Sequence, residues 1–191
     1  MIPIVRQTVA PTTKAVTLDE VKAHLRVDGT ADDTKLTAFI AAATGYIDYP
    51  GVLGKVMITQ TWAVSVARPG FYNMIKLPVG PAADIVSVKY YDTDNAEQTL
   101  TNTDFAITAD EDWAFIKPNA GIVWPSTYCR DDAITITYTA GYGVAADVPD
   151  TLKTAMLMII ASWFEHRGDE AVRIPQAATD LIGLHKIGFV G

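Results

Sequence analysis

The spacing of apolar residues divides the chain into three stretches. Apolar side chains recur every three or four residues up to about position 50, alternate with polar ones from Lys55, and return to helical spacing after Pro149. These periods are those of an α-helix and a β-strand. The pattern predicts an α+β fold: a small helical bundle, with two N-terminal helices and one C-terminal helix, that carries an inserted β-rich region.

The first helix has a clear start signal. Thr17-Leu18-Asp19-Glu20 predicts a capping box, in which the side chains of Thr17 and Glu20 each accept a hydrogen bond from the other residue's backbone amide. Gly29 is placed to end this helix. A second helix is expected from the acidic Thr30–Asp33 segment to Pro50-Gly51. Residues 1–16 contain two prolines and predict an extended arm or a first edge strand.

Residues 55–143 predict antiparallel β-structure. Alternation from Lys55 to Val66 indicates one long strand that buries Trp62 and Val64 on one face. Turn sequences separate the further strand candidates, which are Tyr72–Leu77, Ile85–Tyr91, Glu97–Thr101, Phe105–Thr108, Trp113–Lys117 and Ala133–Thr139. Many short strands at regular spacing favour a β-sandwich or a small barrel.

The last helix is apolar around most of its circumference. It is expected to begin at Pro149 and to end at Gly168, so that residues 17–50 and 148–168 form the helical body. Leu157, Met158 and Phe164 widen its apolar stripe beyond one face, and such a helix must be covered on most sides. These three residues are candidates for contact with another subunit. The tail, residues 169–191, is too apolar to be left free in water.

The excess negative charge is confined to one segment. The net charge of the 191-residue chain is −7, and eight acids with one base, Lys89, lie between Asp84 and Asp112. The rest of the chain carries equal numbers of acids and bases. Tight binding of phosphate backbones by this segment is disfavoured, because it has almost no cations to displace counterions. A solvated β surface kept soluble by carboxylates is the simpler interpretation.

Nothing in the sequence forms a catalytic or metal-binding constellation. His24, His166 and His185 lie in separate segments, and none has a second ligand at metal-binding spacing. Asp92-Thr93-Asp94-Asn95 lacks the glycine and the final glutamate of a calcium loop and is better explained as a hairpin turn. Cys129 is the only cysteine, so an intramolecular disulfide is impossible. We expect no enzyme activity, no metal and no cofactor.

The sequence also predicts that the chain neither enters nor crosses a membrane. Its N-terminus lacks the long apolar core of a signal peptide, and the most apolar stretch, Ala155–Ile160, is too short to span a bilayer. We therefore expect the chain to be cytoplasmic at synthesis.

Four stretches of the sequence form an ordered set of local signals. They are Val16–Val27 with the following Asp32-Asp33 and the alanine-rich helix, Thr59-Gln60-Thr61-Trp62, Val88-Lys89-Tyr90-Tyr91-Asp92, and Ile136–Gly143 continuing through Val148-Pro149 to Ser162–Arg167. Together they resemble the head–tail connector proteins of tailed phages, also called adaptor or head-completion proteins. The longer form with a β insertion is similar to that of phages and gene transfer agents.

The resemblance implies a ring of about twelve copies below the capsid portal, at the head–tail junction of the particle. Its partners would be the portal, the next neck or tail protein, and double-stranded DNA that passes without specific binding. The tail would then dock on the portal, through Ile174, Leu181, Ile182, Leu184, Ile187 and Phe189. An acidic wall would let DNA slide, and its candidates are Asp92, Asp94, Asp110, Glu111 and Asp112.

Two other functions stay open at this point. One is a different neck component, such as a stopper or tail-completion protein, although such proteins are expected to be mainly β. The other is a β-sandwich that binds a small ligand or a glycan, with Trp62, Trp113 and Trp124 as an aromatic platform.

Overall fold

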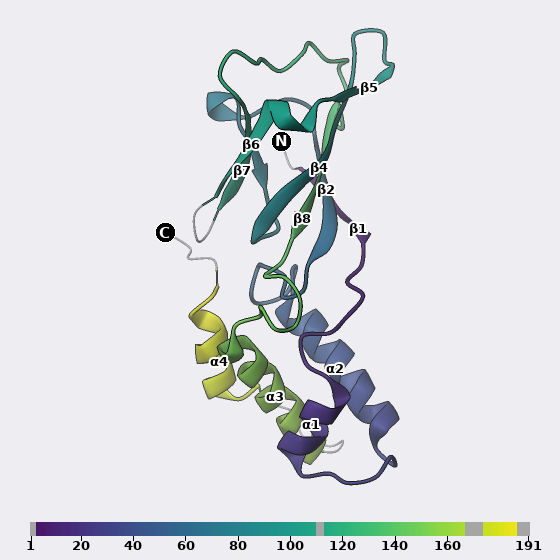
Figure 1. The fold of residues 1–191 in the computed structure, drawn as a ribbon, viewed down its shortest axis with the longest axis vertical. Coiled ribbons are helices and arrows are strands. Elements are labelled where there is room, and N and C mark those ends of the chain that lie inside the picture. Colours follow the sequence, from purple (N-terminus) through teal and green to yellow (C-terminus); the bar gives the residue numbers. More distant parts are fainter. Residues whose placement is uncertain (1–2, 110–112, 167–173, 187–191) are drawn as a thin grey trace. The chain divides into compact units, whose positions relative to one another are not determined.

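A computed structural model describes residues 3–109, 113–166 and 174–186 and confirms the α+β class (Figure 1). The chain divides into two compact units. Met1–Ala10 and Thr59–Gly141 make up the first, which we call the β unit. Pro11–Ile58 and Tyr142–Gly191 make up the second, the helical unit. Segments far apart in sequence therefore fold together in each unit.

The β unit contains two antiparallel sheets. The expected N-terminal arm supplies an edge strand of the larger sheet, β1. The larger sheet has the order β1(Ile4–Val9), β2(Gln60–Val66), β8(Ile134–Ala140), β4(Ala82–Tyr91) and β5(Glu97–Leu100). The smaller sheet has the order β3(Ile75–Leu77), β7(Ala114–Pro118) and β6(Phe105–Ala109), and two short 3-10 turns, η1(Phe71–Asn73) and η2(Asn102–Asp104), lie in the connections.

Buried side chains from both sheets form the core of the β unit. Val64, Ile136 and Val88 are cross-strand neighbours on β2, β8 and β4, and all three are fully buried. Ile116 of β7 is fully buried as well. The hydroxyl of Tyr138 accepts a hydrogen bond of 3.1 Å from the amide of Val79, which satisfies a polar group inside this core.

The strand expected from Lys55 begins five residues later than its alternation indicates, because β2 starts at Gln60. Val56 and Met57 are both fully buried, so this segment has no solvent face. Its backbone is bonded within the helical unit: the amide of Met57 donates to Asp48 Oδ1 at 2.9 Å, and its carbonyl accepts from the amide of Tyr142 at 3.0 Å. The apolar residues of this segment, which is buried on both sides, therefore gave the alternating pattern of a strand with one buried face.

The described part of the helical unit contains four helices, one more than expected. They are α1(Leu18–Leu25), α2(Asp33–Ile47), α3(Asp150–Glu165) and α4(Gln176–Gly183). The capping box of α1 is present as predicted, with both reciprocal hydrogen bonds between Thr17 and Glu20. The predicted end at Gly29 is wrong: α1 ends at Leu25, because Arg26 already adopts the left-handed conformation (φ 56°). The end expected at Gly168 lies outside the described residues.

The unexpected helix, α4, packs against α3 and completes the core of the helical unit. Ala178 and Ile182 of α4 are buried in it. The other members come from α1, α2, α3 and the segments that flank them, and include Val21, Leu36, Ile40, Ile47, Leu53, Met57, Leu152, Met156, Ile159 and Ile160. Part of the predicted apolar tail is therefore already folded.

Candidate interaction surfaces

The second face of α3 is half-buried. Leu157, Met158 and Phe164, the predicted subunit contacts, all pack against the core and keep part of their surface accessible to solvent. Lys35 of α2 lies over the ring of Phe164, with 5.8 Å from its Nζ to the ring centroid. A cation over an aromatic ring contributes about 0.5–1 kcal/mol at such a site. These residues thus combine a structural role with a partly accessible apolar surface.

The predicted portal-docking residues fall into four groups. Ile182 is only 3% exposed, so its assignment to a docking surface is corrected: the side chain is core of the helical unit. Ile174 and Leu181 are half-buried against the same core. Leu184 is 72% exposed just after α4. Ile187 and Phe189 lie outside the described residues.

A histidine holds the end of α4 in place. His185 Nε2 lies 2.7 Å from the hydroxyl oxygen of Thr151 at the start of α3. The ring of His185 also meets the ring of Tyr142 edge-on, with 6.4 Å between centroids. Burial raises the pKa of Tyr142, which keeps its phenol neutral. His185 therefore has a structural role in these contacts.

The acidic β4–β5 hairpin is organised by one carboxylate. Asp92 Oδ1 accepts hydrogen bonds of 3.0 Å from the amides of Asp94 and Ala96, and Asp92 Oδ2 accepts one of 2.8 Å from Gln98. The pKa of Asp92 is lowered most by the hydrogen bond from the Ala96 amide and next by that from Gln98, so this carboxylate stays ionised. Asp94 is exposed at the turn. Asp110, Glu111 and Asp112 lie outside the described residues.

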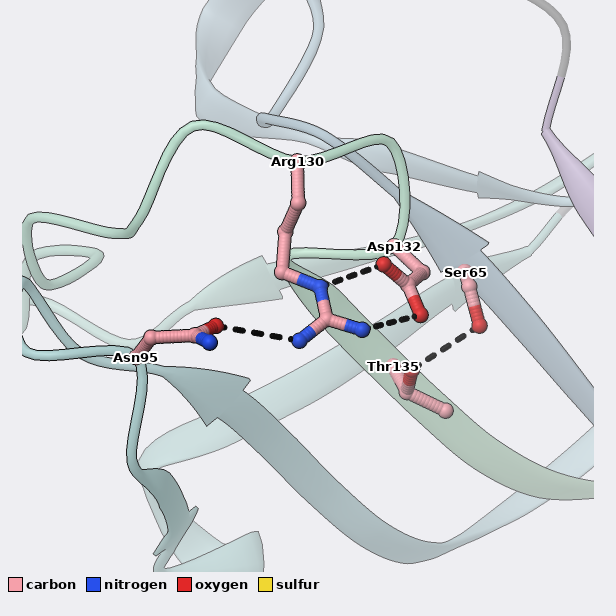
Figure 2. Close-up of polar contacts among 5 residues, drawn as sticks. All are labelled: Ser65, Asn95, Arg130, Asp132 and Thr135. Carbon is pink, nitrogen blue, oxygen red and sulfur yellow. Dashed lines mark hydrogen bonds and ion pairs between the residues drawn. The ribbon is translucent and has the colours of Figure 1, made fainter.

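Arg130 joins this hairpin to the segment that precedes β8 (Figure 2). Its guanidinium donates to both carboxylate oxygens of Asp132, at 2.5 and 2.8 Å, and to Asn95 Oδ1 at 3.1 Å. The same guanidinium stacks on the ring of Tyr91, 3.7 Å from its centroid. The hydrogen bond from Arg130 lowers the pKa of Asp132. A planar, bidentate and stacked arginine fixes relative positions more firmly than a point charge does.

The open face of the five-stranded sheet is polar. Ser65 and Thr135 are cross-strand neighbours whose hydroxyl oxygens lie 2.8 Å apart (Figure 2). Lys89 and Glu97 form an exposed ion pair of 2.7 Å on the same face. Together with Arg6 and Asp132 they line a shallow hollow of about 380 Å³. The charged residues in its described lining are two cations, Arg6 and Lys89, and two acids, Glu97 and Asp132, so the hollow carries little net charge.

A larger, mainly apolar pocket of about 890 Å³ opens elsewhere on the β unit. Among the residues that the structure describes, its charged lining residues are two cations, Arg68 and Lys76. Its other lining residues are Pro3, Val66, Pro69, Gly70, Tyr72, Met74, Ile75 and Phe115. Sequence reasoning missed this pocket, because three segments distant in the chain combine to form it.

Tyr72 stands at the rim of this pocket and is 91% exposed. Tyr72 and Asn73 both have a left-handed backbone, with φ of 58° and 57°. This conformation is unfavourable for a tyrosine and needs support from its surroundings. Trp124 supplies such support, because its indole N–H donates to the carbonyl of Asn73 at 2.8 Å. The exposed side chain of Tyr72 is thus attached to a backbone that Trp124 supports.

The three tryptophans proposed as a glycan platform have other contacts. Trp62 is buried in β2. Lys76 Nζ covers the ring face of Trp113 at 3.3 Å from the centroid. Trp124 packs on Phe105, with 4.6 Å between ring centroids. Each ring therefore packs inside its own part of the β unit, and these contacts give no support to an open sugar-binding platform.

Within residues 3–109, 113–166 and 174–186, the side chains of His, Cys, Asp and Glu form no group of three or more that could hold a metal ion. Cys129 is exposed and free. No helix in the described part of the chain is long and apolar enough to cross a membrane.

Comparison with solved structures finds the same fold in gene transfer agent (GTA) particles. A chain in the neck of an empty GTA particle, with C6 symmetry, has a TM-score of 0.81 and 22% identity, covering 98% of this chain and 97% of that one. A chain in the virion of a native GTA particle has a TM-score of 0.81 and 23% identity, with the same coverage. A chain in the neck of a native particle, with C12 symmetry, has a TM-score of 0.75 and 21% identity, again with that coverage.

Comparison with curated proteins gives no match. Comparison with protein families does: residues 14–175 match the family described as head completion protein. This range spans α1, both sheets except β1, and α3, so it covers elements of both units. The chain belongs to the head completion protein family.

Proposed function

We propose that this chain is a head–tail connector subunit, which forms a ring below the capsid portal and joins the head to the neck or tail. The observation that carries the proposal is the family match over residues 14–175, together with a fold shared along almost the whole chain with proteins of GTA necks. The role is structural, and it assigns no chemistry to any residue.

The symmetry of the similar structures supports a ring of twelve copies. One neck has C12 symmetry and another has C6 symmetry. A ring of twelve is compatible with both, since it also repeats every sixth of a turn. Copies in such a ring meet through two different surfaces, one on each side of the subunit, because head-to-tail contacts are what close a ring.

Within the helical unit, we assign part of this contact to the half-buried face of α3. Leu157, Met158 and Phe164 keep apolar surface accessible, and a neighbouring copy would bury it. In the proposal, the exposed Leu184 and the tail residues Ile187 and Phe189 dock on the portal, beyond the point at which α4 packs on α3.

The proposed ring has a channel for double-stranded DNA, and negative charge on its wall would let DNA slide through. Asp92 contributes through its charge alone, because both of its carboxylate oxygens are occupied by donors of its own hairpin. Asp94, Asp110, Glu111 and Asp112 are the other candidates for this wall.

A stopper or tail-completion protein from the same neck is the alternative of the same class. The arrangement of α1 and α2 before β2 and of α3 after β8 favours the connector, because the alternatives are expected to be mainly β. The contacts of Trp113 and Trp124 do not favour the glycan-binding alternative.

The function is tested by removing the gene from a strain that makes the particles. We expect filled heads without tails to accumulate, and purified protein added to the lysate to restore complete particles. Particles that assemble normally in its absence would overturn the proposal, as would tail-less heads that the purified protein cannot complete.

A further inference from the structure

The apolar pocket at the rim of the β unit has the composition of a binding site for an aromatic, acidic surface. Tyrosine, arginine and methionine are enriched where proteins bind one another, and Tyr72, Arg68 and Met74 line this pocket. Arg68 and Lys76 make it cationic, in a chain whose net charge is −7. An occupant with exposed carboxylates and an apolar side chain would complement both its shape and its charge.

Such a surface is present elsewhere on the same unit. Tyr128 is 45% exposed, and two further exposed acids lie in the same two segments: Asp131, three residues further along the chain, and Asp94, in the β4–β5 turn. The amide of Tyr128 donates to the carbonyl of Tyr91 at 3.0 Å, and Arg130 ties the same segment to Asn95 (Figure 2). These two bonds hold the Tyr128 segment against the β4–β5 hairpin, and we call the exposed residues Tyr128, Asp94 and Asp131 the Tyr128 surface.

The pocket and the Tyr128 surface lie toward opposite edges of the five-stranded sheet. Val66 of the pocket is in β2, next to the edge strand β1, and Pro3 directly precedes β1. Asp94 lies in the hairpin that leads from β4 to the other edge strand, β5. Two complementary surfaces at different places on a subunit can join successive copies head to tail.

We propose that the Tyr128 surface of one copy docks in the pocket lined by Arg68, Tyr72 and Lys76 of the next copy. This inference rests on the proposed ring and names a contact in it. The ring of Tyr128 packs among the apolar side chains of the pocket, and Asp94 and Asp131 face Arg68 and Lys76. Asp94 then belongs to the joint between copies instead of the channel wall.

Chemical cross-linking on assembled rings tests this contact. Cys129 is exposed and follows Tyr128 directly, so it supplies a native thiol on one side of the joint. Tyr72→Cys supplies the other. Rings of this variant, formed with portal and treated with a short bismaleimide, are expected to give a ladder of covalent multimers. Val86→Cys, at another exposed position of the β unit, should give no ladder, and neither should Tyr72→Cys with Cys129→Ser.

Exchanging the charges of Arg68 and Asp94 gives a second, independent test of this contact. Arg68→Glu and Asp94→Arg should each lower the yield of rings at least about tenfold, because the weakened joint recurs in every copy. The double variant should return to within about threefold of the natural protein. Rings that form normally in both single variants and give no Tyr72→Cys ladder would overturn this contact and leave the connector function intact. Absence of rings from the natural protein would overturn both.

Discussion

At the scale of single residues, the buried carboxylate of Asp48 has the most unusual environment in the described chain. Asp48 is 8% exposed at the end of α2, where its Oδ1 accepts a hydrogen bond from the amide of Met57. Burial raises its pKa from 3.8 to about 6, against the opposing effects of that hydrogen bond and of the charge on Lys14. The carboxylate holds the buried segment before β2 onto the end of α2.

Asp48→Asn should make the free energy of unfolding less dependent on pH. Because the pKa of Asp48 is raised in the folded state to about 6, the folded chain keeps a proton that the unfolded chain releases above 3.8. Stability is therefore lost as pH rises through this window and is constant above it. The neutral amide should remove that loss and stabilise the protein by about 1–3 kcal/mol at pH 7.5.

Urea unfolding at pH 4.5 and 7.5 measures this effect. Asp28→Asn, at an exposed loop carboxylate, is the matched control and should leave the natural pH dependence in place. An Asp48→Asn protein with the same pH dependence as the natural one would show that Asp48 does not titrate in this window.

Arg130→Lys should loosen the Tyr128 segment without unfolding the β unit. Lysine keeps the charge but loses the bidentate bond to Asp132 and the stacking on Tyr91. The amide of Tyr128, bonded to Tyr91, should then exchange with solvent faster, while the amide of Ile136 in the central strand β8 should be unaffected. Hydrogen exchange followed by mass spectrometry measures the exchange rates of both amides. Unchanged protection at Tyr128 would mean that Arg130 does not hold the segment.

Some residue roles could be predicted from sequence and others could not. Thr17 and Glu20 were predictable, because a capping box is a local interaction between residues three apart. The end of α1 was not, since the usual signal for a left-handed cap is glycine and the chain uses Arg26. Asp92 was predicted to lie in a turn, but its three acceptor contacts depend on the folded hairpin.

At the scale of elements, the start of α1 depends on its capping box. The amide and the hydroxyl of Thr17 donate to Glu20 Oε2 at 2.6 and 2.8 Å, and the amide of Glu20 donates to the Thr17 hydroxyl at 3.2 Å. Thr17→Ala should lower the free energy of unfolding by about 1 kcal/mol. Thr13→Ala, at an exposed position before the helix, should change it by less than about 0.3 kcal/mol. Equal effects in urea unfolding would contradict a capping role.

The packing of α4 depends on Ile182. Removing this buried side chain by Ile182→Ala should cost about 2–4 kcal/mol and release α4 from α3. Limited proteolysis should then cut the C-terminal segment early. Leu184→Ala removes an exposed side chain two residues away and is expected to stay within about 0.5 kcal/mol of the natural protein. If both variants resist protease equally, α4 is not held by Ile182.

Element types were more predictable than their limits. β4 to β8 all lie where alternation and turn residues indicate them, because short antiparallel strands carry local signals. The true start of β2 was obscured because Val56 and Met57 are buried on both sides. α4 was missed because it is short and buries only Ala178 and Ile182, too few apolar positions to show a period.

At the scale of the whole molecule, the two periods in the sequence predict the fold class, and the family follows from ordered local segments that fall in both units. The apolar pocket could not be predicted, because Pro3, Arg68 and Phe115 meet only after the sheets have formed. The complementary Tyr128 surface depends likewise on Arg130 linking two segments. Interfaces between copies can therefore be inferred only from the folded structure, not from the sequence pattern.

The proposed closure of this chain into a ring on the portal can be observed by electron microscopy of the purified protein mixed with its portal, with native mass spectrometry of the same sample. We expect rings of twelve copies, in line with the C12 symmetry of the similar neck, seated on the portal and open at the centre. A sample in which the protein stays monomeric in the presence of portal would contradict it.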